Sequence, residues 1–209
     1  SDVCSSDLTG PGPEEAIVRT GVGGLKVQTG RGMIIVPVAH AADKMDLSVK
    51  RIEIAREGED GLICQDNIRA DIRVAFYGRV NNQQNDIMQV AEMLNPKRAS
   101  EINQLRELFE AKFSEALKTV GKQFDFVSLY TDRDNFREQI LNVIGTDLNG
   151  YRLDNCHIDY LEQTPLESLN PQNILDAEGI KKITELTTQE NMKRNSFAVE
   201  ESKVIKQQD

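Results

Sequence analysis

The sequence contains no apolar run long enough to cross a bilayer as a helix. Its longest apolar stretches, such as Met33 to Val38, are far shorter than the roughly 20 residues that a transmembrane helix needs. It also has no basic tract interleaved with aromatic residues, and its formal net charge of −9 argues against nucleic acid as a partner. With 209 residues, of which 39% are hydrophobic, the chain can still bury the core of one or two ordinary domains.

Cysteine and histidine are scarce. Cys4, Cys64 and Cys156 lie far apart without a C-x-x-C spacing, and the histidines are His40 and His157. We therefore expect neither a disulfide framework nor a metal site. Cys156 and His157 are neighbours in an alternating stretch, so their side chains should point to opposite faces of a strand rather than form a catalytic pair. A buried structural thiol is the expected role of Cys156, and reduced thiols suit a cytoplasmic setting.

Glycine is concentrated in residues 20–38, TGVGGLKVQTGRGMIIVPV. A dinucleotide fingerprint needs G-x-G-x-x-G between a strand and a helix, because the helix N-terminus supplies the amides that bind the pyrophosphate. Here Gly21-x-Gly23 is followed by Gly24 and another strand-like segment, and the chain has no G-x-x-x-x-G-K-[ST] motif. The pattern predicts turns between strands and no cofactor.

The region from Glu15 to Val80 is patterned for β-structure. Residues 66–80 alternate between an apolar and a polar face, which is typical of a half-buried strand. The predicted buried residues are Ile68, Ala70, Ile72, Val74, Phe76 and Val80, and the predicted solvent-facing ones are Arg69, Asp71, Arg73, Tyr77 and Arg79. Further strand candidates are residues 24–29, 33–38 and 46–56, the second of them at a sheet edge because Pro37 donates no hydrogen bond. Short strands with tight connections predict an antiparallel sheet.

After Asn81 the apolar spacing becomes helical. A short helix is predicted from Asp86 to Asn95-Pro96, and an amphipathic one over residues 100–124 with Ser100 as N-cap. The apolar stripe of the second helix comprises Ile102, Leu105, Phe109, Phe113, Ala116, Leu117 and Val120. Its acidic residues alternate with basic ones, which favours an ion-paired outer surface over a pair of catalytic carboxylates.

A third helix is predicted within residues 130–150, capped by Thr131 or Asp132 and ended by Asn149-Gly150. It should turn Phe136, Ile140, Ile144 and Leu148 inward. The stretch that follows returns to a strand, with Leu153, Ile158 and Tyr160 toward the sheet. The expected fold class is α+β, an antiparallel sheet with packed amphipathic helices.

The C-terminal stretch is polar with helical spacing. From Asn173 onward it is rich in Glu, Lys and Gln, has Gly179 as its one strong breaker, and its apolar residues thin out after Leu186. We predict a long helix that enters a truncated coiled coil, because such a helix needs a partner to be stable. A disordered polar tail is the alternative.

Four stretches carry a family resemblance when taken in order. They are residues 24–40 (GLKVQTGRGMIIVPVAH), 43–54 (DKMDLSVKRIEI), 62–80 (LICQDNIRADIRVAFYGRV) and 160–184 (YLEQTPLESLNPQNILDAEGIKKIT). The chain resembles the SPFH or band 7 family of stomatin, prohibitin and flotillin, and within it the bacterial flotillin-like proteins. Two positions depart from the family pattern, Cys64 in place of a usual threonine and Gly78 in place of a larger strand residue.

The resemblance implies three parts. Residues 14–170 would form the SPFH domain, and residues 171–209 would begin an extended helical or coiled-coil region. Residues 1–13 would be an artefactual or disordered leader, since SDVCSSDL lacks periodicity and looks like translated adapter DNA. An N-terminal membrane anchor and most of the coiled coil would lie outside this chain.

The function that the resemblance implies is a non-enzymatic membrane-associated scaffold that homo-oligomerises to organise membrane microdomains. No catalytic residue, cofactor or metal is implied; membrane lipids and an NfeD-type membrane protease are the expected partners, with the domain facing the cytoplasm at the bacterial plasma membrane. Val36, Pro37 and Val38 are the expected membrane-apposed residues, unless they are core. Two alternatives stay open, an adaptor that regulates a membrane-bound protease and a soluble phosphate- or nucleotide-binding enzyme that uses Lys26 and Arg31.

Overall fold

The computed structural model of the chain describes residues 10–36, 38–145 and 147–208, without the side chains of 147, 204 and 206–208. The described residues form two compact units. Unit 1 contains those up to Ala55 together with Arg73–Leu117 and Arg137–Asp159. Unit 2 contains Arg56–Ile72, Lys118–Phe136 and the residues from Tyr160 onward.

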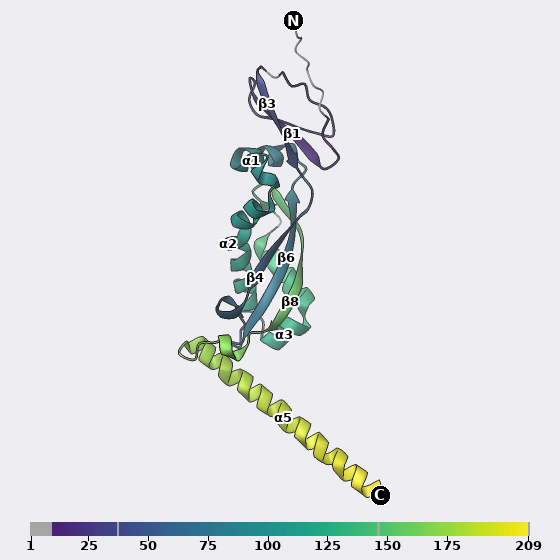
Figure 1. Cartoon of the computed structure of the whole chain (residues 1–209), viewed down its shortest axis with the longest axis vertical. Coiled ribbons are helices and arrows are strands. Elements are labelled where there is room, and N and C mark those ends of the chain that lie inside the picture. The colour runs from purple at the N-terminus through teal and green to yellow at the C-terminus, as the bar shows by residue number, and fades with distance from the viewer. Residues whose placement is uncertain (1–9, 37, 146, 209) are drawn as a thin grey trace. The chain divides into compact units, whose positions relative to one another are not determined.

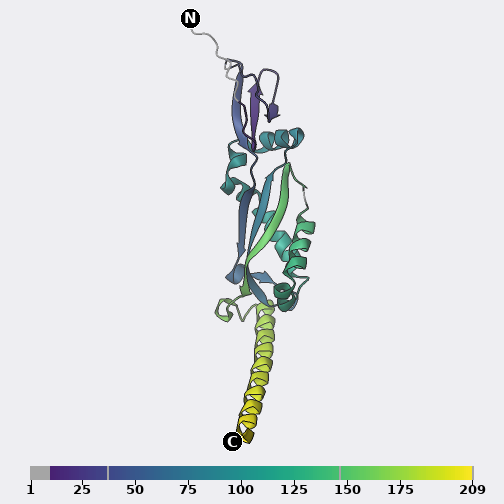
Figure 2. The same ribbon diagram turned by 90° about the vertical axis from the view of Figure 1, so that its right-hand side faces the viewer.

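A three-stranded antiparallel sheet belongs to unit 1 (Figure 2). In the order β2-β1-β3, its strands are β1 (Glu15–Gly21), β2 (Lys26–Thr29) and β3 (His40–Asp46). The turn after β1 contains Gly21, Gly23 and Gly24, whose φ angles of 126°, 91° and 80° lie in the region that favours glycine. The prediction that these glycines form a turn between strands is confirmed, because β2 follows them where a phosphate-binding loop would need a helix.

The strand predicted at residues 33–38 is wrong. Met33 makes a single β-bridge, and Ile34–Val36 have no regular structure. Pro37 lies outside the described residues, and Val38 lies in a turn. The edge strands of this sheet are β2 and β3. Only Met45 of β3 is buried, and an edge strand of this kind needs no apolar alternation, so the hydrophobic pattern does not reveal it.

A second sheet has the strand order β4-β6-β8-β7, with β5 paired to β6 (Figure 1). Its strands are β4 (Lys50–Arg56), β5 (Leu62–Ile63), β6 (Arg69–Val80), β7 (Asp147–Leu148) and β8 (Tyr151–Gln163). The six residues predicted for the apolar face of residues 66–80 are all buried, and so is Cys156 on β8. Tyr160 departs from its prediction, because it is 42% exposed while Leu161 is buried. The burial pattern of β8 changes phase between Leu153 and Cys156.

The helices of the described chain cover most of the predicted helical segments. They are α1 (Gln84–Leu94), α2 (Ile102–Gly121), α3 (Phe126–Thr131), α4 (Arg133–Ile144) and α5 (Ile174–Gln208), with 3-10 turns η1 (Gly58–Asp60), η2 (Arg98–Ser100) and η3 (Leu166–Ser168). The fold is therefore α+β, as predicted. Asp132 directly precedes α4, whereas Thr131, the other predicted cap, ends α3.

The apolar stripe of α2 is buried from Leu105 onward and carries the aromatic core of unit 1. The ring of Phe113 stacks on Phe76 with centroids 4.3 Å apart, and Phe109 meets Tyr151 edge-on at 5.2 Å. Ile102, predicted inward, is 46% exposed in the first turn of α2.

Ser100 does not cap α2 as predicted. It lies in η2, where its hydroxyl donates to the Pro96 carbonyl at 2.9 Å and accepts from the Asp46 N–H at 3.1 Å. The hydroxyl therefore ties η2 to the end of β3 within unit 1.

α4 ends earlier than predicted. Gly145, with a φ of 78°, follows the last helical residue, Ile144. Leu148 is buried as expected, but it lies in β7. Asn149 and Gly150, with φ angles of 57° and 92°, form the turn of the β7–β8 hairpin, for which Asn-Gly is the strongest short signal.

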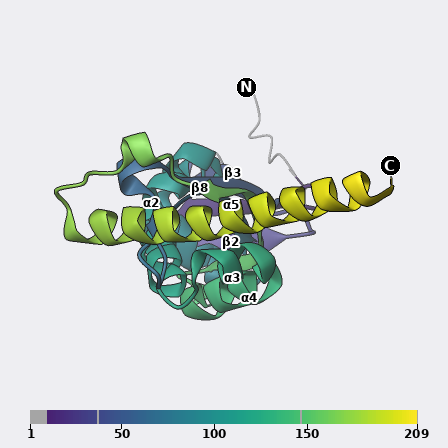
Figure 3. The same ribbon diagram turned by 90° about the horizontal axis from the view of Figure 1, so that it is seen from below.

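The long helix predicted from Asn173 is confirmed as α5, one unbroken helix in Figures 1 and 3. Over the part of the chain that the structure describes, no helix combines the length and the apolar character needed to cross a membrane.

Candidate functional site

The apolar residues expected beside a membrane lie in the loop between β2 and β3. Val38 is 92% exposed, Val36 is half-buried, and Pro37 lies outside the described residues. Two further apolar side chains are exposed close by, Val22 in the β1–β2 turn at 73% and Ile34 at 64%. We refer to Val22, Ile34 and Val38 as the apolar tip.

Hydrogen bonds between side chains and backbone connect the segments that carry the apolar tip. The Val36 N–H donates to His40 Nδ1 at 3.2 Å, and His40 Nε2 lies 3.1 Å from the Val22 carbonyl oxygen. Since Nδ1 accepts, the ring proton is assigned to Nε2, which donates to that carbonyl. Arg19 Nη1 donates to the Ile34 carbonyl at 3.1 Å. Loop and turn thus form one connected surface that exposes apolar side chains.

A buried ion pair in unit 2 fixes the start of α5. Arg69 Nε and Nη2 donate to Asp176 Oδ1 at 3.1 and 2.6 Å, and Arg69 Nη1 donates to the carbonyls of Glu59 and Gly61. The second carboxylate oxygen of Asp176 accepts from the Asn170 N–H at 3.1 Å. Burial raises the pKa of Asp176, but the hydrogen bonds from Arg69 and Asn170 and the charge of Arg69 outweigh it and hold the pKa below its ordinary value.

The first turns of α5 also fit closely against the residues before β6. Asn67, with a φ of 62°, donates from Nδ2 to Glu178 Oε2 at 2.6 Å. A Cβ atom on Gly179 would lie 2.4 Å from the Asn67 carbonyl oxygen, so only glycine permits this approach. We refer to Arg69, Asp176 and Gly179 as the α5 anchor. An apolar cluster accompanies it: Ile68, Leu169 and Ile183 are buried, with Phe126, Ile180 and Leu186 packed against them.

Beyond Leu186, α5 has no covered face in the part of the chain that the structure describes. Residues 187–203 are all exposed, including Met192 at 67% and Phe197 at 68%. A helix with so little buried surface gains almost nothing from packing within its own chain. This half of α5 is a surface available to a partner helix.

Sequence reasoning missed the α5 anchor and placed Arg69 on the solvent face of its strand. The observed Arg69 is only 8% exposed. Its partner Asp176 is 107 residues away in the sequence and stands in the first turn of a helix, where an acidic residue is ordinary helix chemistry. No local pattern distinguishes such an aspartate from a surface one, so the pairing has no signal in a single sequence.

The two described cysteines are buried free thiols. Burial raises the pKa of Cys64 to about 12, helped by the charges of Asp66 and Asp125, and raises the pKa of Cys156 to about 11. His157 meets the ring of Tyr77 edge-on at 5.4 Å. Among the described residues, no group of three or more His, Cys, Asp or Glu side chains could hold a metal ion.

The glycine-rich segment does not assemble a site around Lys26 and Arg31. Lys26 and Arg31 are both exposed, at the start of β2 and just after it. A hollow of about 80 Å³ in this region is lined by Val27, Gln28, Thr29 and Gln84 and includes neither cation. A phosphate-binding role for this segment therefore has no geometric support in the described residues.

Comparison with known proteins supplies the family. Residues 12–208 match the model of the SPFH domain / Band 7 family. The chain is 35% identical over 184 residues to the flotillin family inner membrane protein YqiK of Escherichia coli K12, which covers 87% of this chain and 33% of YqiK. It is 29% identical over 176 residues to the flotillin family inner membrane protein sll1021 of Synechocystis, which covers 82% of this chain and 26% of that protein.

The chain thus spans a third or less of the length of both relatives. The family match covers nearly all described residues, the α5 helix included, and it confirms the resemblance carried by the four sequence stretches. This chain belongs to the SPFH domain / Band 7 family.

Proposed function

We propose that this chain is part of a membrane-associated, non-enzymatic scaffold that works by self-association and organises membrane microdomains. The observation that carries the proposal is α5, which is fixed at its base by a buried ion pair and fully exposed along residues 187–203. A long polar helix is marginal without a partner, and side-by-side packing of α5 helices from several copies would cover Phe197 and its neighbours.

Membrane association is the second part of the proposal. Both relatives are named as inner membrane proteins. The apolar tip would lie at the bilayer interface, with the SPFH domain on the cytoplasmic side. Burial of its three side chains contributes roughly 1.5–3 kcal/mol of binding free energy each, before the entropy lost on association is subtracted. This is too little for one copy to stay bound by the apolar tip alone. Assembly of many copies would multiply these weak contacts.

Self-association is tested by measuring the mass of the full-length gene product over a range of concentrations with light scattering and negative-stain electron microscopy. We expect large assemblies that Phe197→Glu weakens by about tenfold or more, since a charge would be buried between helices. Ser196→Glu, the exposed neighbour with the same added charge, serves as the matched control. Monomers at every concentration would overturn the scaffold, and a small complex of fixed size captured with a membrane-bound protease would point to an adaptor instead.

Membrane contact by the apolar tip is tested by flotation of the protein with vesicles of bacterial lipids. A triple variant, Val22→Asp with Ile34→Asp and Val38→Asp, should reduce the vesicle-bound fraction. Val143→Asp, at a 46% exposed position on α4, is the control that should bind as wild type does. Equal binding of the triple variant and wild type would exclude the tip as a membrane contact.

A further inference from the structure

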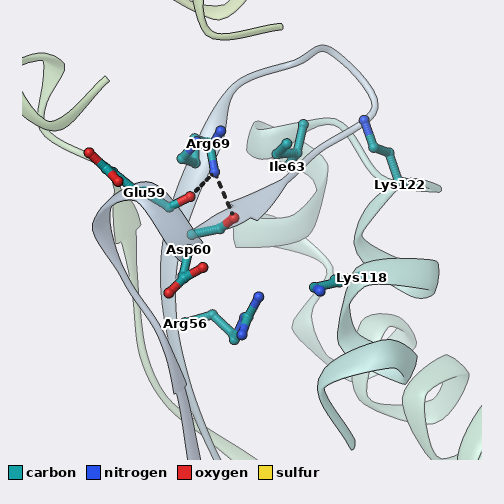
Figure 4. A pocket seen from close by; sticks show the side chains of 8 residues that line it. Arg56, Glu59, Asp60, Ile63, Arg69, Lys118 and Lys122 are labelled. Carbon is teal, nitrogen blue, oxygen red and sulfur yellow. Dashed lines mark hydrogen bonds between the residues drawn. The ribbon is translucent and has the colours of Figure 1, made fainter. Parts of the chain in front are cut away.

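A basic pocket in unit 2 has no role in the scaffold proposed above. It encloses about 310 Å³, and Figure 4 shows its side chains. Four of the lining side chains are cationic and two are anionic: Arg56, Arg69, Lys118 and Lys122, with Glu59 and Asp60. A cluster of positive charge on a chain with a net charge of −9 needs an explanation.

Different elements bring these cations together. Arg56 ends β4, and Arg69 begins β6. Lys118 lies in the last turn of α2, and Lys122, four residues later, directly follows that helix. Like charges at this spacing on a helix repel each other. The negative end of the helix dipole offsets only part of that repulsion. In the free pocket the repulsion between these cations raises the free energy of the folded state. A bound anion would reduce that repulsion.

Arg69 already has its partners, but the other cations of the pocket do not. The hydrogen bonds of Arg69 go to Asp176 and to the carbonyls of Glu59 and Gly61. Arg56 Nε is buried and has no hydrogen-bond partner, and buried donors are almost always paired in folded proteins. Within the described residues, neither Lys118 nor Lys122 forms an ion pair.

The two carboxylates of the pocket do not neutralise these cations. Glu59 and Asp60 are exposed in η1, where water screens their charge. In Figure 4 both carboxylates are directed away from the side of the pocket where Lys118 and Lys122 lie. Positive charge without an ion-pair partner therefore remains among the residues that line the pocket.

We propose that this pocket binds a phosphate group, carried either by a small soluble molecule or by a lipid headgroup. A guanidinium matches two phosphate oxygens with its fork of N–H donors, and ammonium groups add point charges. Arg56 would supply the fork, including the buried Nε donor, and Lys118 and Lys122 would bind the remaining oxygens. The cavity has room for more than a bare ion, so a phosphomonoester is the fitting ligand class.

The test with soluble ligand is a thermal-unfolding titration of the full chain with inorganic phosphate and pyrophosphate, at ionic strength held constant with chloride. Ligand that binds only the folded state raises the Tm in proportion to its occupancy. We expect a saturable rise for wild type, and affinities weakened by about tenfold or more in Arg56→Gln and in the double variant Lys118→Gln, Lys122→Gln. Lys112→Gln, an exposed position on the same helix with the same change of charge, should titrate as wild type does.

The lipid source is tested by flotation with vesicles that contain phosphatidic acid, against vesicles of phosphatidylcholine alone. Binding to phosphatidic acid that is lost in Arg56→Gln and kept in Lys112→Gln supports a headgroup ligand. A saturable Tm rise without such binding supports a soluble ligand. The circular dichroism spectrum of each variant verifies folding beforehand, and the proposal is overturned if the pocket variants match wild type in both assays or if wild type responds in neither.

Discussion

Arg69 is buried at a position where its sequence pattern predicts a solvent-facing residue. On β6 it stands at a position that strict alternation assigns to water, yet its guanidinium is buried with Asp176. Desolvation makes such a pair costly to form, so its net contribution to stability is small when both partners are present. Removal of one partner is different, because the other charge is then left buried and unpaired.

Asp176→Asn should therefore destabilise the protein by about 3–5 kcal/mol, as measured by chemical denaturation. The double variant Arg69→Met, Asp176→Leu should recover most of the lost free energy of unfolding, because it leaves no buried charge without a partner. If Asp176→Asn alone cost no more than an exposed surface substitution, about 0.5 kcal/mol, the ion pair would not anchor α5.

The same pair predicts how stability depends on pH. The pKa of Asp176 is lowered in the folded state, so its contribution is present above the ordinary carboxyl value of 3.8 and is lost as the pH falls through the lower, native value. Denaturation curves of wild type and of Arg69→Met, Asp176→Leu should differ in their pH dependence below about pH 4. Identical pH profiles in that range would contradict the assignment.

The two buried thiols should be inert in the folded protein. The pKa values of Cys64 and Cys156 are raised by burial, so almost no thiolate forms at neutral pH and neither sulfur reaches solvent. Peptide mass spectrometry after iodoacetamide treatment should find both unmodified, and both labelled when denaturant is added. Rapid labelling of Cys156 in native protein would indicate a reactive site that the described geometry does not contain.

At the scale of elements, α5 depends on a glycine inside a helix. Glycine ordinarily destabilises a helix interior by about 1 kcal/mol relative to alanine. Gly179 is retained at this cost because it lets the helix backbone approach the Asn67 carbonyl. Gly78 on β6 has no such constraint, since a Cβ there would meet the Arg152 carbonyl at an ordinary 3.5 Å.

Gly179→Ala and Gly78→Ala are therefore predicted to differ in their effect on stability. Gly179→Ala should destabilise the protein by about 1–3 kcal/mol, because the methyl group forces the helix away from its anchor. Gly78→Ala should be neutral or stabilising by up to about 1 kcal/mol, since alanine loses less backbone entropy in a strand. Chemical denaturation of the two variants side by side measures both effects, and stabilisation by Gly179→Ala would refute the close fit.

At the scale of the whole molecule, the proposed activities belong to different parts of the chain. Unit 1 carries the apolar tip, and unit 2 carries α5 and the basic pocket. The distal half of α5 buries almost nothing within the described chain, so its hydrogen bonds should open easily unless another copy covers it.

Hydrogen exchange should therefore distinguish the two halves of α5. In dilute, monomeric protein we expect rapid exchange of amides over residues 190–205 and slow exchange around Ile180 and Ile183, which lie at the anchored end. In assembled protein the distal half should become protected. Protection of the distal half that did not change with concentration would show that it is stable without a partner.

Local patterns were sufficient where one face of an element is apolar throughout. The alternation of residues 68–80, the stripe from Leu105 to Val120 and the polar helix from Asn173 all predicted elements that the structure contains. The glycines after β1 likewise predicted a turn, because a positive φ is a property of the residue itself. In each of these cases the physical cause acts between near neighbours in the chain.

Long-range contacts decided the remaining features. β3 is a strand because β1 pairs with it, and Arg69 is buried because Asp176 reaches it from 107 residues away. The sequence by itself determined the α+β class, the glycine turn after β1 and the exposed character of α5, since these follow from period and composition. Only the tertiary structure decided where α5 is anchored and that Arg56, Lys118 and Lys122 surround one pocket, because charges from separate elements come together only when the chain folds.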